Sequence, residues 1–285
     1  MKNKKIIIAV IAVAAVIAAV ITAIAVWGNK NSDKQELQSI ALSEKVNSYI
    51  MPVNLIAHRG FSGLAPENTV ASIKAAGDAD FFGAEFDIRL SADNVWVVSH
   101  DNDVERMTDG EGLISEKTLE EIKKLNIDSG SNVIQHNGEK IPTLEEALTA
   151  CKEYGAYPII EIKLEDGQKP DYDALARILR EKGFADCTVI AFSSEALTGL
   201  KEKLPTAEYW LLVSEMSDSV IKTCVDNGFD GIDFNATKKK NLKYIEKAAE
   251  ADLVVGAWTV NDIGLLDDLY EKGVYYITTN VIYPS

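Results

Sequence analysis

Cysteine is scarce in this chain, with three residues in 285. Cys151, Cys187 and Cys224 lie 36 and 37 residues apart, and neither a Cys-x-x-Cys pair nor a neighbouring histidine gives them the spacing of a metal site. A chain of this length needs no disulfide framework to fold. The three cysteines are therefore predicted to be small, buried apolar residues.

Basic residues are also few. The chain carries 29 lysines and arginines against 44 aspartates and glutamates, which gives a net charge of −15. Proteins bind nucleic acids through clustered lysine and arginine, so a net charge of this sign argues against a nucleic-acid partner. A single anionic group could still be held locally by one or two basic side chains or by a bound cation.

Long apolar runs are absent except for Ile6–Trp27. Thr22 is the only polar side chain in these 22 residues. A helix of that length spans roughly 33 Å, about the hydrocarbon core of a bilayer. The sequence therefore predicts a signal anchor or transmembrane helix over residues 1–28, followed by a polar linker over residues 29–51.

The charges around this run predict its orientation. Lys2, Lys4 and Lys5 precede it, which favours an N-inside, C-outside topology. We therefore predict a single-pass protein of the cell membrane whose main domain is extracellular. A cleaved signal peptide is the alternative, because Ala23 and Ala25 form an Ala-x-Ala-like site, and the domain would then be secreted.

Residues 52–285 alternate short Val- and Ile-rich runs with helical patterns, as repeated βα units of a parallel sheet do. Eight strands are predicted, at Val53–Ala57, Gly83–Leu90, Tyr157–Lys163, Cys187–Phe192, Glu208–Val213, Gly231–Phe234, Leu253–Trp258 and Tyr275–Thr279. Helices are predicted between them, including Asn68–Ala79, Leu144–Tyr154, Tyr172–Lys182, Ser219–Asn227, Asn241–Ala251 and Ile263–Glu271. This pattern favours an α/β fold of one domain, a (β/α)8 TIM barrel, while a doubly wound open sheet remains the alternative.

The longest departure from the βα rhythm lies between His100 and Pro142. An extra strand is predicted just before it, at Val95–Ser99, and a helix inside it, around Glu116–Leu125. In a barrel this stretch would be a small insertion after strand 2, near the end where loops carry function.

Histidine is as scarce as cysteine, with three residues. His58 and His100 each follow an apolar, strand-like run, which in a barrel places them at the catalytic end of the strands. Neutral imidazoles there can act as acid and base near neutral pH, whereas a structural role would be the ordinary interpretation of either one alone. His136 lies in a polar loop and is predicted to have no role.

Acidic residues occur at alternate positions of two predicted strands. Glu85 and Asp87 are two residues apart, so both carboxylates face the same side, and Glu161 and Lys163 repeat this spacing. Glu85, Asp87 and Glu161 are predicted to bind one divalent cation, Mg²⁺ or Ca²⁺, because oxygen ligands suit hard cations better than zinc. The alternative is a charged network with Lys163 and Arg59 that holds no metal.

Several short motifs occur in order along the chain. They are Ile56-Ala57-His58-Arg59-Gly60, Pro66-Glu67-Asn68-Thr69, Glu85-Phe86-Asp87, Val97-Val98-Ser99-His100-Asp101, Ile141-Pro142-Thr143-Leu144-Glu145-Glu146 and Glu161-Ile162-Lys163. Together they make the chain, from about Val53 to its C-terminus, resemble the glycerophosphodiester phosphodiesterase family. The resemblance implies a TIM-barrel hydrolase that uses a divalent cation to cleave glycerophosphodiesters to an alcohol and glycerol 3-phosphate.

The resemblance also implies roles for single residues. His58 and His100 become the general acid and base pair, and Glu85, Asp87 and Glu161 the metal ligands. Arg59 and Lys163 are placed on the phosphate and Trp258 at the substrate pocket, although Trp258 could equally be a core aromatic residue. The chain departs from the family pattern after the last strand, where Asn280 stands in place of the aspartate that many members have.

Two other functions remain open. A lysophospholipase D or another lipid- or cell-envelope-directed phosphodiesterase is one, because the predicted anchor would bring the domain close to lipid. A catalytically silent TIM-barrel binding protein is the other. The predicted partners are accordingly a small-molecule or lipid-derived glycerophosphodiester of lipid metabolism and the membrane.

Overall fold

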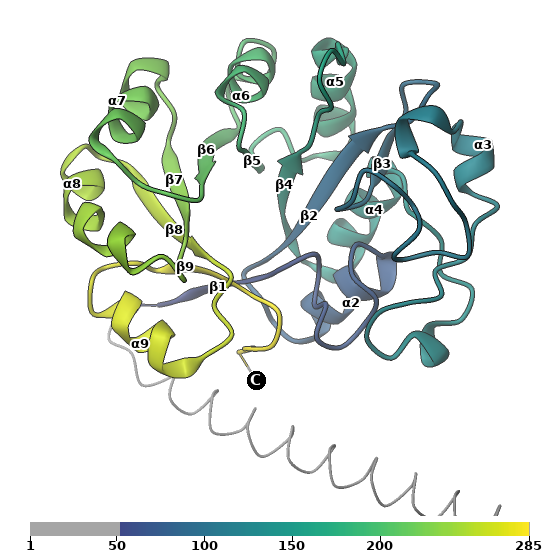
Figure 1. Cartoon of the computed structure of the whole chain (residues 1–285), viewed down its shortest axis with the longest axis horizontal. Helices are drawn as coiled ribbons and strands as arrows, with labels where there is room; N and C mark the ends of the chain where they lie inside the picture. The colour runs from purple at the N-terminus through teal and green to yellow at the C-terminus, as the bar shows by residue number, and fades with distance from the viewer. Residues whose placement is uncertain (1–51, 285) are drawn as a thin grey trace, which may run out of the picture.

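Eight parallel strands close into a barrel in the computed structural model, which describes residues 52–284 (Figure 1). The barrel strands are β1 (Asn54–Ala57), β2 (Gly83–Leu90), β4 (Tyr157–Ile162), β5 (Thr188–Ala191), β6 (Glu208–Val213), β7 (Gly231–Asn235), β8 (Val254–Trp258) and β9 (Tyr276–Thr279). Strand β1 pairs with both β9 and β2, and this double pairing closes the sheet. The predicted TIM barrel is confirmed, and the open-sheet alternative is wrong.

Helices lie outside the strands (Figure 1). They are α2 (Val70–Asp78), α4 (Leu144–Tyr154), α5 (Tyr172–Lys182), α6 (Ser194–Lys201), α7 (Asp218–Asn227), α8 (Ile245–Glu250) and α9 (Ile263–Tyr270). A side-chain cap starts most of them, as where Thr69 accepts a hydrogen bond from the Ser72 amide at α2. The helix predicted at Asn241–Ala251 was only partly right, because a 3₁₀ turn over Lys239–Tyr244 precedes the short α8.

Successive side chains of each strand point to opposite faces of the sheet, so the buried side chains form two layers. One large cluster fills the space between the strands and the helices, and it includes the three cysteines, which are free and buried as predicted. A smaller apolar cluster lies inside the barrel, with Ile56, Ile159, Ile190, Trp210 and Leu212. The interior is thus packed with side chains, and only its end is left for a site.

The chain between β2 and α4 departs from the barrel pattern. The extra strand predicted at Val95–Ser99 forms as β3 (Trp96–Val98), which runs antiparallel to β2. A 3₁₀ turn (Ile114–Glu116) and the one-turn helix α3 (Leu119–Ile122) replace the longer helix predicted around Glu116–Leu125. A separate apolar cluster that includes Val97, Val104 and Ile141 holds this insertion on the barrel.

The predicted membrane segment (1–28) and the linker (29–51) lie outside the described residues. Within residues 52–284, no helix is long and apolar enough to cross a bilayer. The membrane anchor and the extracellular location therefore stay predictions.

Candidate active site

The predicted site residues meet at the carboxyl end of the barrel strands. A pocket of about 260 Å³ is lined by seven of them, namely His58, Arg59, Glu85, His100, Glu161, Lys163 and Trp258. The eighth, Asp87, is 1 % exposed and lies beside them on β2. Residues from three strands and three loops, far apart in the sequence, are thus brought to one place.

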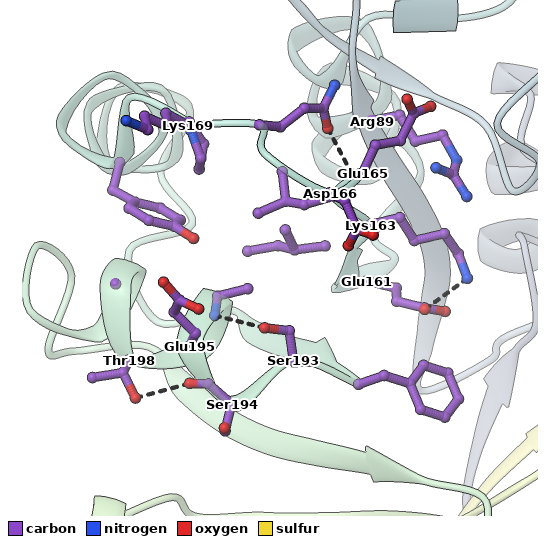
Figure 2. Close-up of a pocket in the computed structure, with 18 of the residues that line it drawn as sticks. Arg89, Glu161, Lys163, Glu165, Asp166, Lys169, Ser193, Ser194, Glu195 and Thr198 are labelled. Carbon is purple, nitrogen blue, oxygen red and sulfur yellow. Dashed lines mark hydrogen bonds and ion pairs between the residues drawn. The ribbon is translucent and has the colours of Figure 1, made fainter. Parts of the chain in front are cut away.

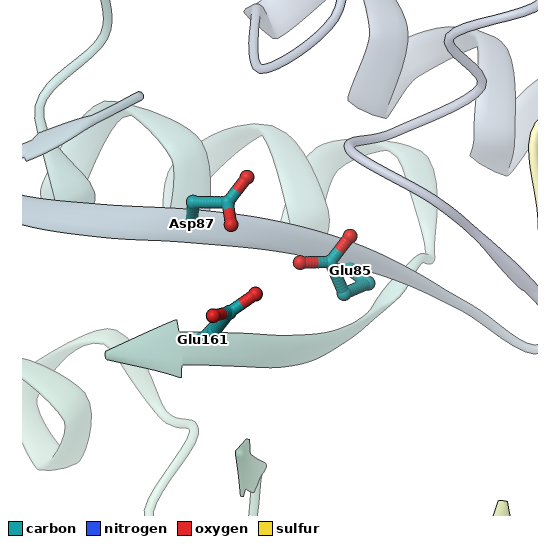
Figure 3. A group of neighbouring side chains, drawn as sticks. All are labelled: Glu85, Asp87 and Glu161. Carbon is teal, nitrogen blue, oxygen red and sulfur yellow. The ribbon is translucent and has the colours of Figure 1, made fainter. Parts of the chain in front are cut away.

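Three carboxylates form the centre of the site (Figure 3). Glu85 and Asp87 lie on β2, and the parallel pairing of β2 with β4 sets Glu161 opposite Asp87. One oxygen from each side chain lies within 4.8 Å of the others, and the three residues are 2 %, 1 % and 8 % exposed. Buried acids this close repel one another, so their charge must be neutralised by protons, by basic side chains or by a cation.

The pKa values show how this repulsion is divided among the acids. Burial, and then the charge of Asp87, raise the pKa of Glu161 to about 8 and that of Glu85 well above its ordinary value. Burial acts on Asp87 in the same direction, but the charges of Lys163, His100 and Arg59 outweigh it and hold the pKa of Asp87 at about 2. Without a cation, protons would therefore collect on the two glutamates while Asp87 stays ionised.

Two basic side chains partly balance the acids. Lys163 Nζ lies 2.7 Å from Glu161 Oε1 and 3.3 Å from Asp87 Oδ1, and Arg59 Nε lies 3.9 Å from Asp87 Oδ2. The contacts expected of a metal-free charged network are therefore present. They do not reach every acid oxygen, because Glu85 Oε1 is buried with no hydrogen-bond partner in the part of the chain that the structure describes.

These side chains fit a divalent cation. A hard cation takes carboxylate oxygens as ligands, and an unpartnered buried carboxylate oxygen such as Glu85 Oε1 is costly unless something binds it. Asn68 donates its amide Nδ2–H to Asp87 Oδ2 at 2.8 Å and accepts from the Asp87 backbone N–H at 3.1 Å. Hydrogen bonds from a neighbouring residue orient a carboxylate that binds a metal. With Oδ2 held by Asn68, Asp87 presents its other oxygen, Oδ1, to the cluster.

The turn after β1 depends on a glycine. Arg59 and Gly60 both have a left-handed backbone, with φ of 57° and 68°, and this turn aims the Arg59 backbone N–H at Glu85 Oε2, 2.7 Å away. A Cβ atom on Gly60 would lie 2.6 Å from the Ser72 backbone carbon. Only glycine fits there, and the close approach of α2 to the turn holds the first site residues in place.

His58 is fixed by Asn280. The ring nitrogen Nδ1 donates to Asn280 Oδ1 at 2.7 Å, so Nε2, which lies 4.0 Å from Glu85 Oε2, is left without a proton. Burial, and then the positive charge of Arg59, lower the pKa of His58 to about 4. The imidazole is consequently neutral at physiological pH and able to accept a proton.

His100 is held through a chain of ion pairs. Its Nδ1 lies 2.8 Å from Asp101 Oδ1, and Arg106 from the insertion binds Asp101. Arg106 also binds Glu67 at 2.7 Å, and Glu67 in turn accepts from Arg59 at 2.8 Å. Through Arg106, the insertion thus connects Asp101, which orients His100, to Glu67, which orients Arg59.

Sequence reasoning missed one residue of the pocket, Asp233 on β7. Asp233 lines the same pocket, is 3 % exposed, and has a buried oxygen, Oδ1, without a hydrogen-bond partner among residues 52–284. The alternation that revealed Glu85 and Asp87 also applies here, because Asp233 stands between the apolar Ile232 and Phe234 in a predicted strand. A lone acid in a strand was a weaker signal than a pair.

A larger cavity of about 1040 Å³ adjoins the pocket (Figure 2). The two share Glu161, Lys163 and Phe192. The loop after β4 and the start of α6 form most of its wall, with acidic side chains such as Glu165 and Glu195. A substrate bound at the acids could therefore extend into a second, wider space.

Known proteins resemble this chain over most of the described residues. Residues 58–282 match the model of the glycerophosphoryl diester phosphodiesterase family. A glycerophosphodiester phosphodiesterase of Bacillus subtilis is 30 % identical over 81 % of this chain and 83 % of its own length. Glycerophosphodiester phosphodiesterase 1 of mouse is 41 % identical over 39 % of this chain, and the match spans only 34 % of the mouse protein.

Solved structures share the fold. A phosphodiesterase of Oleispira antarctica, solved in complex with the product sn-glycerol-3-phosphate, is 30 % identical and superimposes with a TM-score of 0.73 over 80 % of this chain and 93 % of the other. The shared fold therefore covers most of the described residues.

Proposed function

This chain belongs to the glycerophosphoryl diester phosphodiesterase family, and from that premise we propose that it hydrolyses glycerophosphodiesters to glycerol 3-phosphate and an alcohol. The observation that carries the proposal is the single pocket of about 260 Å³ that collects two histidines, two of the three clustered acids, an arginine and a lysine. Acid, base and charge-neutralising groups at one place are what hydrolysis of a phosphodiester requires.

Glu85, Asp87 and Glu161 would hold the divalent cation. When bound, the cation supplies positive charge to the phosphate oxygens and so favours the transition state. Mg²⁺ and Ca²⁺ both suit three carboxylates. Arg59 and Lys163 line the same pocket and can hold the remaining phosphate oxygens with charge-assisted hydrogen bonds.

The two histidines would move the protons. His58, unprotonated at Nε2, accepts the proton of the nucleophile. His100, whose Nδ1 lies 2.8 Å from Asp101 Oδ1, would give a proton to the leaving oxygen. Burial lowers the pKa of His100, and the contact with the Asp101 carboxylate opposes that decrease. The nucleophile is either the glycerol 2-hydroxyl, which gives a cyclic phosphate that water then opens, or water itself.

Direct turnover tests the proposal. The purified full-length chain is treated with EDTA and then incubated with glycerophosphocholine, glycerophosphoethanolamine or glycerophosphoglycerol, without cation, with Mg²⁺ or with Ca²⁺. We expect glycerol 3-phosphate to be released only after a cation is added. The activity would be refuted if none of the three diesters released glycerol 3-phosphate with Mg²⁺ or with Ca²⁺.

The burial of His58 predicts an unusual pH profile. Since burial lowers the pKa of His58 to about 4, the acidic limb of kcat/KM should lie a unit or more below the ordinary histidine value of about 6.5. An Asn280→Asp variant places a carboxylate on Nδ1, which favours imidazolium and should raise the limb by about 1–2 pH units. An acidic limb at the same pH in both proteins would contradict the assignment of His58 as the base.

A lipid-directed activity is the second candidate. The 1040 Å³ cavity beside the pocket has room for more than a small alcohol, and this supports assays with lysophospholipids beside glycerophosphodiesters. Release of lysophosphatidate rather than glycerol 3-phosphate would favour a lysophospholipase D. Measurable cation-dependent hydrolysis of either class would exclude a silent binding protein.

The location of the enzyme is also a proposal. We infer from the apolar run over residues 6–27 and the three lysines before it that the barrel faces outward on a single-pass anchor. Protease treatment of intact cells would digest an outward-facing barrel and spare an inward-facing one.

A further inference from the structure

Asp233 is a buried acid that the proposed chemistry does not use. Its neighbours Ile232 and Phe234 pack in the outer apolar cluster, so Asp233 faces the barrel interior, where it lines the catalytic pocket. It is 3 % exposed, and its Oδ1 has no hydrogen-bond partner in residues 52–284. A buried polar group left in this state costs free energy and needs an explanation.

The surrounding residues leave space for this carboxyl group. Gly256 lies opposite Asp233 in the pairing of β7 with β8, and a Cβ atom on Gly256 would come within 3.0 Å of Asp233 Oδ1. Trp258 Nε1 donates to the Asp233 backbone oxygen at 3.2 Å, which fixes the indole beside the same strand. The acid is thus accommodated beside an aromatic ring and not forced out by packing.

Part of the pocket wall is apolar. Ile190 and Leu212 line the pocket and belong to the cluster inside the barrel, and Trp258 packs on that cluster. An apolar wall beside an unpartnered hydrogen-bonding group suits a small molecule that has both CH and OH groups. We infer that Asp233 is a specificity-determining residue that binds a hydroxyl group of the substrate's glycerol moiety, an inference that rests on the proposed function.

The protonation of Asp233 is consistent with this role. Burial, and then the charge of Glu161, raise the pKa of Asp233 well above its ordinary value. A protonated carboxyl both donates and accepts hydrogen bonds, as a hydroxyl group does, and it adds no further charge beside the three acids.

Substrate selectivity tests the inference. The ratio of kcat/KM for glycerophosphoethanolamine to that for bis(p-nitrophenyl) phosphate, which has no aliphatic hydroxyl, is measured in the full-length chain. Asp233→Leu, similar in size but without hydrogen bonds, should lower this ratio about tenfold or more, mainly through KM for the glycerol substrate, and Asp233→Asn should lower it less. Asp226→Asn, an exposed acid on α7, is the matched control and should not change the ratio.

Thermal unfolding separates recognition from a structural role. An unpaired buried acid does not stabilise the fold, so Asp233→Leu should unfold at the same temperature as the wild type or higher. An unchanged selectivity ratio, with or without a fall in the unfolding temperature, would overturn the inference.

A binding measurement keeps the inference separate from the proposed function. Calorimetric titration with sn-glycerol 3-phosphate and with inorganic phosphate, both in the presence of Mg²⁺, does not depend on turnover. Asp233→Leu should weaken the binding of sn-glycerol 3-phosphate about tenfold more than the binding of inorganic phosphate. Equal weakening of both would count against Asp233, whereas a wild type that binds selectively but hydrolyses no diester would count against the activity alone.

Discussion

Replacing His58 or His100 by alanine is expected to lower kcat for glycerophosphodiesters about 10²–10⁴-fold, the range typical of a lost general acid or base. Both rings line the pocket, and each has one ring nitrogen fixed by a side chain, Asn280 for His58 and Asp101 for His100. Arg59 and Lys163, the proposed phosphate-binding residues, are unchanged in either variant, so KM should change much less than kcat. Steady-state kinetics of the full-length variants provide the measurement.

The third histidine is a natural control. His136 lies in a 3₁₀ turn of the insertion and does not line the pocket, so His136→Ala should behave as the wild type. If the histidines act as a pair, the double variant should lose little more activity than the worse single variant, because residues that act together are not additive. Wild-type turnover in both single variants would refute the acid–base assignment.

Much of the barrel could be predicted because its signals are local. Short Val- and Ile-rich runs mark strands that are buried on both faces, and these runs alternate with helices that start at capping residues. The insertion was harder to predict. Its 3₁₀ turn at Ile114–Glu116 and one-turn helix at Leu119–Ile122 are held by contacts with the barrel, and such tertiary contacts leave no periodic pattern in the sequence.

The site was predictable where two polar residues share a strand face. Glu85 with Asp87, and Glu161 with Lys163, stand out because a single interior acid can be accidental but an alternating pair is costly. Asp233 has no such companion and was missed. Asn280 was noticed only as a departure from a pattern, since its contact with His58 joins residues 222 positions apart.

Contacts between loops could not be predicted from spacing. Arg106 reaches both Asp101 and Glu67, and these pairings depend on how the insertion folds over the turn after β1. The residues around Arg106 in the sequence do not distinguish it from any other surface arginine. Only the assembled fold reveals that it connects the supports of His100 and Arg59.

Glu85→Gln is expected to remove the response to a divalent cation. The amide keeps the size of the side chain but loses the charge, so the proposed cation site loses one of its three carboxylates, and cation-dependent kcat should fall about 10³-fold. In the wild type, saturating Mg²⁺ or Ca²⁺ should raise the unfolding temperature by about 5 °C or more, and in Glu85→Gln this shift should be nearly absent. Glu153→Gln, an exposed position on α4, is the charge-matched control.

The pH dependence of this stabilisation separates a cation site from a charged network. Burial and the charge of Asp87 raise the pKa of Glu161 to about 8, so the folded chain without cation holds a proton that the unfolded chain loses near pH 4.5. The stability from that proton is complete below pH 4.5 and is lost as the pH rises through about 8. A cation needs ionised ligands, so the stabilisation it adds should grow from pH 6 to pH 8.5. If Lys163 and Arg59 alone completed the network, Mg²⁺ or Ca²⁺ would not shift the unfolding temperature at either pH. That result would exclude the cation site and would not bear on the fold.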